Sequence, residues 1–139
     1  MRSWRFAALM LVVGVAVAAG QDTPVSATAG FLAFAALAAV FSPLAFPRSL
    51  TAAQARRRSA DDGRPVIYWR PGCTYCLRLR LRLGGRARRA YWVDIWRDPE
   101  AAAAVRVVTG GDETVPTVVL PDRAVVNPDP AWLRARLGA

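Results

Sequence analysis

Two cysteines, Cys73 and Cys76, are the residues whose type and spacing most clearly point to chemistry in this chain of 139 residues. They form a C-x-x-C pair, and the sequence contains no other cysteine. Two thiols at this spacing either cycle between a dithiol and a disulfide or supply half of a zinc site. The chain has no histidine, and two cysteines cannot provide the four ligands of a structural zinc site. We therefore expect redox chemistry here and no bound metal.

The segments on either side of the pair indicate how it is positioned. Residues 65–69 form a short β-branched and aromatic run that is typical of a buried strand, and Pro71-Gly72 ends it. Residues 77–83 alternate leucine with arginine, which is the period of a strand. Leucine and arginine nevertheless favour helices, and no β-branched residue occurs in this run. We predict a helix that ends at Gly84-Gly85.

The elements predicted further along the chain are a strand, a helix, a hairpin and a last helix. They are a strand over 90–95, a helix over 101–108 that Asp98-Pro99 opens, strands over 117–120 and 124–126, and a helix that begins at Asp129-Pro130. A strand–helix–strand unit makes a right-handed parallel crossover, whereas a hairpin adds antiparallel strands. The sequence therefore predicts an α/β domain over residues 61–139, with a four-stranded mixed sheet flanked by helices.

Several motifs of residues 64–138 together resemble one known family. They are residues 73–79, residues 93–95, Gly110-Gly111, residues 114–118 and Asn127-Pro128. In this combination they are similar to glutaredoxin-like proteins of the mycoredoxin group. The resemblance implies a thioredoxin fold and a thiol–disulfide oxidoreductase that reduces mixed disulfides between proteins and a low-molecular-weight thiol. The first 60 residues lie outside the resemblance.

The position of the pair at a helix start, together with the resemblance, assigns roles to the residues around it. Cys73, at the start of the helix, is the expected nucleophile, and the deeper Cys76 is the expected resolving thiol. Backbone N–H groups at a helix start and a nearby cation stabilise a thiolate, and we expect Arg70 to be that cation. Pro116 is expected in cis, which would leave the backbone of Val115 free to pair with a substrate.

The remaining expected contacts are with the low-molecular-weight thiol. Tyr75 either lines the cleft or is an exposed helix residue. We expect Asn127 to contact the thiol. Asp129 either contacts it too or only caps the last helix. The Gly-Gly-Asp that glutathione-dependent glutaredoxins carry near this point is missing, and the resemblance implies mycothiol rather than glutathione as the co-substrate. A second departure is Gly72, where many relatives have tryptophan.

Three other functions are alternatives to this one. The net charge of +9 comes from 19 arginines without any lysine, but these are interleaved with apolar residues and no nucleic-acid-binding motif occurs, so we expect no nucleic-acid partner. A non-catalytic module could hold an iron–sulfur cluster between two chains through Cys73 and an external thiol. A domain outside the membrane could oxidise secreted proteins.

The N-terminal part of the chain contains two apolar runs, over residues 4–20 and 30–46. Arginines flank the pair of runs on both sides, and the connector at 21–29 has none. We therefore predict a two-helix transmembrane hairpin as a membrane anchor over residues 1–60, with a basic linker that includes Arg56, Arg57 and Arg58. Both ends, and so the redox domain, would face the cytoplasm. If the first run were instead a cleaved signal peptide at Ala16-Val17-Ala18, the domain would lie on the same side.

Overall fold

The computed structural model describes residues 5–42 and 46–138, and its chain divides into two compact units, residues 1–45 and 46–139. The second unit begins before residue 61, where the sequence analysis placed the start of the redox domain. It therefore includes a helix that was assigned to the linker.

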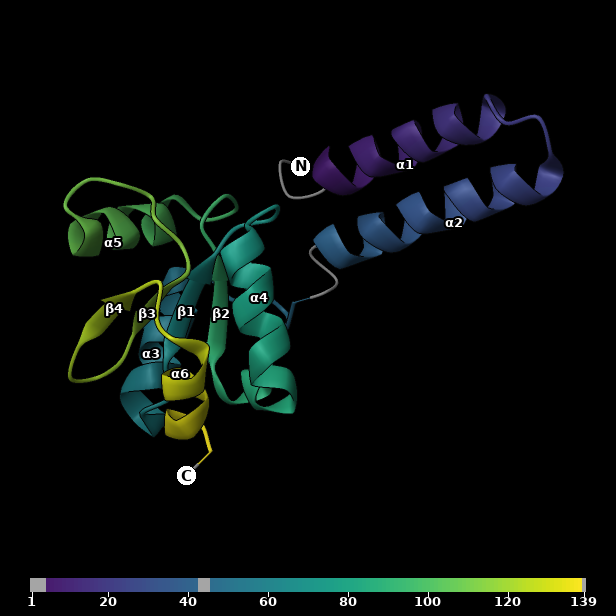
Figure 1. Ribbon diagram of the computed structural model, residues 1–139. Coiled ribbons are helices and arrows are strands. Elements are labelled where there is room, and N and C mark those ends of the chain that lie inside the picture. The colour runs from purple at the N-terminus through teal and green to yellow at the C-terminus, as the bar shows by residue number, and fades with distance from the viewer. Residues whose placement is uncertain (1–4, 43–45, 139) are drawn as a thin grey trace. The chain divides into compact units, whose positions relative to one another are not determined.

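The first unit is a hairpin of two helices, α1 (Arg5–Ala19) and α2 (Pro24–Phe41) (Figure 1). Thr23 caps α2, because its side chain accepts a hydrogen bond from the N–H of Ser26, and Pro24 occupies the first turn. The helices approach closely at Gly14, where a Cβ atom would lie only 2.7 Å from the Cβ of Phe34. A glycine at this position is what allows the two helices to pack.

The prediction of a transmembrane hairpin is wrong. In residues 5–42 and 46–138, no helix is both long enough and apolar enough to cross a membrane. The 15 residues of α1 and 18 residues of α2 correspond to about 22 and 27 Å of helix, against a hydrocarbon core of roughly 30 Å. The predicted membrane location, the cytoplasmic orientation and the lipid bilayer as a partner rested on these spans and are withdrawn with them.

Both ends of the second predicted span differ from the structure. Helix α2 begins at Pro24, so it includes Ser26 and Thr28 from the supposed connector, which makes it less apolar. Phe46, the last residue of the predicted span, belongs to the second unit, where its ring stacks on Trp69 with centroids 3.8 Å apart. Trp4 and residues 43–45 lie outside the described residues.

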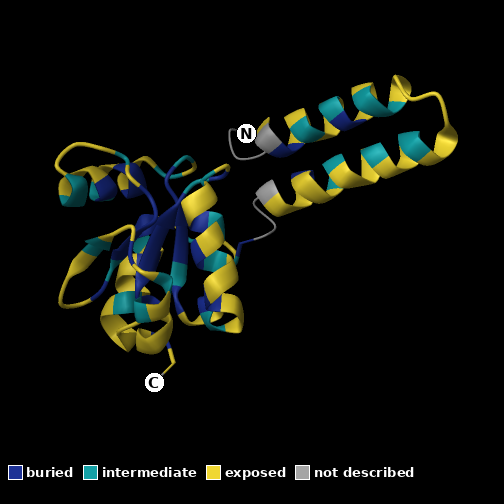
Figure 2. Ribbon diagram, viewed as in Figure 1, coloured by how far each residue is buried: buried dark blue, intermediate teal, exposed yellow. Residues whose placement is uncertain are grey.

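The second unit is built on a four-stranded mixed sheet in the order β2-β1-β3-β4. Its strands are β1 (Val66–Trp69), β2 (Tyr91–Asp94), β3 (Thr117–Val119) and β4 (Ala124–Val126). Strand β1 pairs in parallel with β2 and antiparallel with β3, which in turn pairs antiparallel with β4. Every residue of β1 is buried (Figure 2), as expected for a strand covered on both faces.

Two pairs of helices cover the sheet. Helix α3 (Ala52–Asp62) contacts β1, β2 and α5 (Pro99–Thr109), whereas α4 (Thr74–Leu83) packs on α6 (Pro130–Arg136) on the opposite face (Figure 1). A 3₁₀ helix, η3 (Gly84–Arg89), follows α4 directly. The predicted helix over 77–83, the four strands and the mixed sheet are confirmed. Helix α3 was not predicted.

One carboxylate joins the starts of two of these helices. Asp98 caps α5 by accepting a hydrogen bond from the N–H of Glu100, at 3.0 Å, with one oxygen. With its other oxygen it accepts a 2.6 Å hydrogen bond from the N–H of Ala52 at the start of α3. Both N–H groups would otherwise lack a partner within their helices. Asp98 therefore fixes α3 against α5.

Replacing this carboxylate should destabilise the second unit. Asp98→Ala leaves an N–H group unpaired at the start of both helices, and we expect the free energy of unfolding to fall by about 2 kcal/mol. Urea unfolding followed by tryptophan fluorescence measures the change. The control is Asp61→Ala at an exposed position of α3, which should change stability by less than about 0.5 kcal/mol. Equal effects of the two substitutions would contradict this role.

Candidate redox site

The turn after β1 places Cys73 at the first turn of α4. Residues 70–72 leave the strand, and Gly72 has a φ of 77°, a conformation that favours glycine. Cys73 is the N-cap residue of α4, and its carbonyl accepts a 3.0 Å hydrogen bond from the N–H of Leu77. The helix therefore starts at the first cysteine of the pair.

The two cysteines form a disulfide, with their Cα atoms 5.2 Å apart. The N–H of Cys76 points at the sulfur of Cys73, at a distance of 3.1 Å. Cys73 is partly exposed, but Cys76 is completely buried beneath the first turn of α4. A molecule in solution can therefore reach the sulfur of Cys73 and not that of Cys76.

The segment before β3 lies beside this disulfide. The carbonyl oxygen of Val115 is 3.5 Å from the sulfur of Cys73, and the Val115-Pro116 peptide bond is cis, as expected from the resemblance. The carbonyl of Pro116 accepts a 2.7 Å hydrogen bond from the N–H of Asn127. In the part of the chain that the structure describes, Val115 forms no hydrogen bond with another backbone group.

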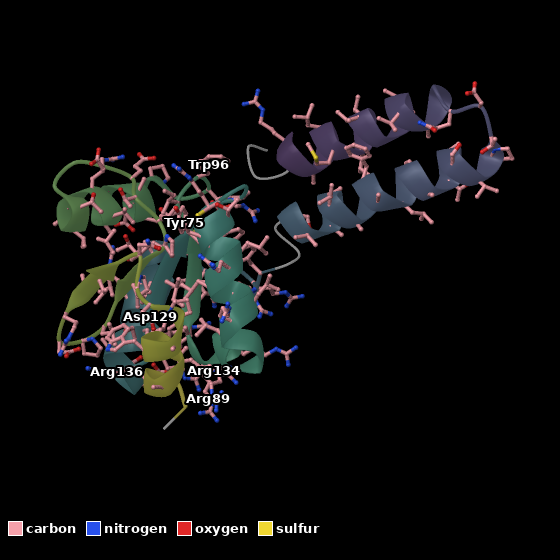
Figure 3. All side chains as sticks on the ribbon, viewed as in Figure 1. Tyr75, Arg89, Trp96, Asp129, Arg134 and Arg136 are labelled. Atoms are coloured by element: carbon pink, nitrogen blue, oxygen red, sulfur yellow. A yellow bond between two sulfur atoms is a disulfide. The ribbon has the colours of Figure 1, made fainter. Side chains whose placement is uncertain are left out.

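A cavity of about 320 Å³ next to the pair brings together four of the residues predicted for thiol binding. These four are Tyr75, Pro116, Asn127 and Asp129. Tyr75 lines the cavity although 59% of its surface is exposed. Figure 3 shows Tyr75 on α4 and Asp129 at the start of α6.

Asn127 and Asp129 also have structural roles at this cavity. Asn127 has a φ of 47°, which asparagine tolerates better than most residues. One oxygen of Asp129 accepts a 2.8 Å hydrogen bond from the N–H of Trp132 and so caps α6. The helix-cap reading of Asp129 is therefore correct, and it is compatible with a further contact through the second oxygen.

Arg70 lies between β1 and the pair, and its carbonyl accepts a 3.4 Å hydrogen bond from the N–H of Cys73. Its guanidinium carbon is 5.9 Å from the centre of the Trp96 ring, in the loop after β2. Among the described contacts, none joins this guanidinium to the sulfur of Cys73. Trp96 therefore borders Arg70, whereas Trp69 and Trp92 are buried in the core.

Four further residues line the cavity and were not predicted for thiol binding: Arg78, Leu79, Pro128 and Pro130. Arg78 follows Tyr75 by three positions on α4, and this spacing places both on one side of a helix. That signal was present in the sequence. Pro128 comes from the turn before α6 and Pro130 is the first residue of α6, and only the fold brings this part of the chain next to α4.

The shifted pKa values belong to residues other than those predicted for the site. Burial raises the pKa of Tyr68 in β1. A hydrogen bond of 2.5 Å from the hydroxyl of Tyr91 lowers the pKa of Asp62, and the same bond raises the pKa of Tyr91. The hydrogen bond from Arg123 lowers the pKa of Asp122.

The second unit has a mixed four-stranded sheet between helices, and its C-x-x-C pair lies at a helix start beside a cis-proline. These features define a thioredoxin-like redox domain. The glutaredoxin family model matches residues 66–125. Two proteins of Mycobacterium tuberculosis, one from each of two strains and both named as glutaredoxins, are 39% identical to this chain over 73 residues. The matched part is 52% of this chain and 87% of each relative. The chain belongs to the glutaredoxin family.

The difference in burial predicts how the reduced cysteines react. We expect iodoacetamide to alkylate Cys73 at least about tenfold faster than Cys76, because thiol reactivity requires access as well as thiolate character. Mass mapping of peptides after short reaction times measures both rates. In urea the two rates should become similar, which serves as the control. Faster alkylation of Cys76 in the folded protein would contradict the structure.

Proposed function

We propose that this protein is a thiol–disulfide oxidoreductase that reduces mixed disulfides between proteins and a low-molecular-weight thiol. The observation that carries the proposal is the position of the Cys73 sulfur. It is partly exposed at the start of α4, receives the N–H of Cys76 at 3.1 Å and lies beside the backbone of Val115. An N–H group aimed at a sulfur favours the thiolate, which is the reactive form.

In the first step, the Cys73 thiolate attacks the sulfur of the low-molecular-weight thiol in the mixed disulfide. The bond between that sulfur and the client protein breaks, and the client leaves as a thiolate that takes up a proton. A new disulfide then joins Cys73 to the small thiol. In this state, Tyr75, Asn127 and Asp129 would surround the small thiol, and the backbone of Val115 would pair with it.

Two routes complete the cycle. A second molecule of the small thiol attacks the one held on Cys73, which releases the Cys73 thiolate and forms the oxidised small thiol. Alternatively, the Cys76 thiolate attacks the sulfur of Cys73 and expels the small thiol. The second route gives the Cys73–Cys76 disulfide seen in the structure. The first route therefore consumes one added molecule of the small thiol. In the second route, two molecules of the small thiol reduce the Cys73–Cys76 disulfide, and their oxidised form is again the product.

Mycothiol is the co-substrate we favour over glutathione. The segment before α6 reads Val126-Asn127-Pro128-Asp129 and lacks the Gly-Gly-Asp expected of a glutathione-dependent site. Both similar proteins reported above come from a mycobacterium. The finer assignment to the mycoredoxin group rests on the same two observations.

Substitution of each cysteine tests this mechanism. Cys73→Ser should lower the rate of reduction of a protein–mycothiol mixed disulfide by more than about a thousandfold, because it removes the nucleophile. Cys76→Ser should retain activity within about tenfold, because the small thiol alone completes the cycle. The assay follows release of the client thiol, with mycothiol and glutathione mixed disulfides compared side by side. An active Cys73→Ser protein would refute the mechanism.

The same preparations separate this proposal from an iron–sulfur module. In residues 5–42 and 46–138, no group of three or more His, Cys, Asp or Glu side chains is placed to hold a metal ion. A cluster shared between two chains would give visible absorbance after anaerobic purification. A coloured dimer without reductase activity would therefore favour the binding module.

A further inference from the structure

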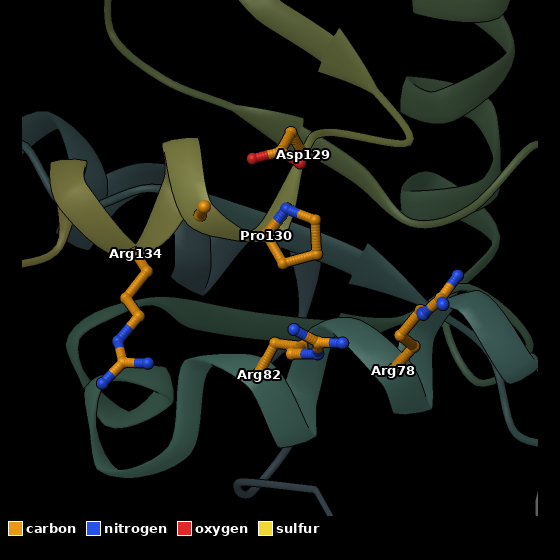
Figure 4. Close-up of a pocket in the computed structure, with 6 residues that line it drawn as sticks. Arg78, Arg82, Asp129, Pro130 and Arg134 are labelled. Atoms are coloured by element: carbon orange, nitrogen blue, oxygen red, sulfur yellow. The ribbon is translucent and has the colours of Figure 1, made fainter.

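A second group of cavities lies on the same face of the domain as the redox site, between α4 and α6. One of about 330 Å³ is lined by Arg78, Arg82 and Arg134 together with the start of α6 (Figure 4). Another of about 540 Å³ is lined by Arg82, Arg86, Arg89 and Arg134. The two share Arg82 and Arg134 and are therefore adjacent, and we call them together the α4–α6 basic groove.

The positive charge of this groove is poorly balanced within the domain. Among residues 5–42 and 46–138, Asp129 is the one acidic residue that lines it, and it already caps α6. The ion pairs found among the described residues involve arginines outside the groove. Arg78 and Arg82 are one turn apart on α4, where two like charges destabilise a helix. An anionic partner would relieve this repulsion.

The groove opens into the redox cavity. Arg78, Asp129 and Pro130 line both the groove and the cavity that contains Tyr75 and Pro116. Figure 3 shows Tyr75 near one end of α4, with Arg89 and Arg134 toward the other. A client chain whose mixed disulfide reaches the Cys73 sulfur, with the small thiol in the cavity, can therefore lie along the arginines beside it.

The length of α4 sets the spacing that such a chain needs. Arg82 follows Cys73 by nine positions, which is about 14 Å along a helix. An extended peptide covers that distance in about four residues. An acidic side chain about four positions from the client cysteine would thus reach Arg82 and Arg134.

We propose that the α4–α6 basic groove binds an acidic segment of the client protein, so that cysteines with Asp or Glu about four residues away are preferred substrates. This inference rests on the proposed reductase function and names the class of its protein substrates. Carboxylate pairs with arginine are charge-assisted and well matched in geometry. The groove acts in choosing the client and has no part in the thiol exchange.

The test uses the full chain and two synthetic peptides. Each peptide carries one cysteine as a mixed disulfide with mycothiol and is otherwise neutral. One has Glu at four positions before and four positions after the cysteine, and the other has Gln at both positions. We expect kcat/KM to be about fivefold higher for the Glu peptide. The preference should shrink as ionic strength rises from about 0.02 to about 0.3 M.

Paired variants locate the preference in the groove. Arg82→Gln combined with Arg134→Gln should bring the ratio of the two kcat/KM values close to one. Arg57→Gln is the matched control, because Arg57 is exposed on α3, on the other face of the sheet, and the ratio should not change. Equal turnover of both peptides by the unchanged protein would overturn the proposal. An unchanged ratio of the two kcat/KM values in the groove variants would also overturn the proposal.

Binding measured without turnover separates this inference from the reductase function. Fluorescently labelled peptides with serine in place of cysteine should show about fivefold tighter binding for the Glu form. That result supports the groove even if no mixed disulfide is reduced, in which case the reductase function alone fails. Tighter binding of single-stranded DNA than of the Glu peptide, lost in the groove variants, would overturn the proposal in favour of a nucleic-acid partner.

Discussion

The burial of β1 on both faces is the constraint on which the redox site depends. Its antiparallel register with β3 pairs Tyr68 with Thr117, so the end of β1 lies next to the residues just before β3. The turn that carries Cys73 and the segment that carries Val115 therefore meet at one edge of the sheet. Because neighbouring strands hold β1 on each side, this meeting does not depend on any contact between the side chains of the site.

The parts of the site that the sequence predicted are those that local chemistry determines. A cysteine that caps its own helix, a proline before a β-branched run and an Asp-Pro at a helix start each act over two or three residues. The alternation of Leu and Arg in residues 77–83 has the period of a strand, but both residues intrinsically prefer a helix. The prediction of a helix followed that preference and is correct. The α4–α6 basic groove could not be predicted in this way, because it exists only where two distant helices pack.

Prediction from the sequence was wrong where the apolar pattern of a segment does not match its burial in the structure. Helix α3 buries only Ala52 and Ala55, so its arginine-rich sequence shows little of the apolar repeat expected of a packed helix. The opposite error occurred at the N-terminus, where a long apolar run suggested a membrane span. In the structure that run is divided between α2 and Phe46, whose ring belongs to the core of the other unit. An apolar run by itself does not reveal what covers it.

The segment from Phe46 to Leu50 also decides how much of the chain can fold on its own. The N–H of Leu50 bonds to the carbonyl of Trp92, and the hydroxyl of Ser49 accepts from the N–H of Asp94, so this segment shields the outer side of β2, which is an edge strand. A fragment cut at the first residue of the family match, Val66, would leave that edge bare and Trp69 uncovered. Bare edges recruit strands from other molecules. The redox unit therefore needs residues before Val66, outside the region matched by the family, in order to fold on its own.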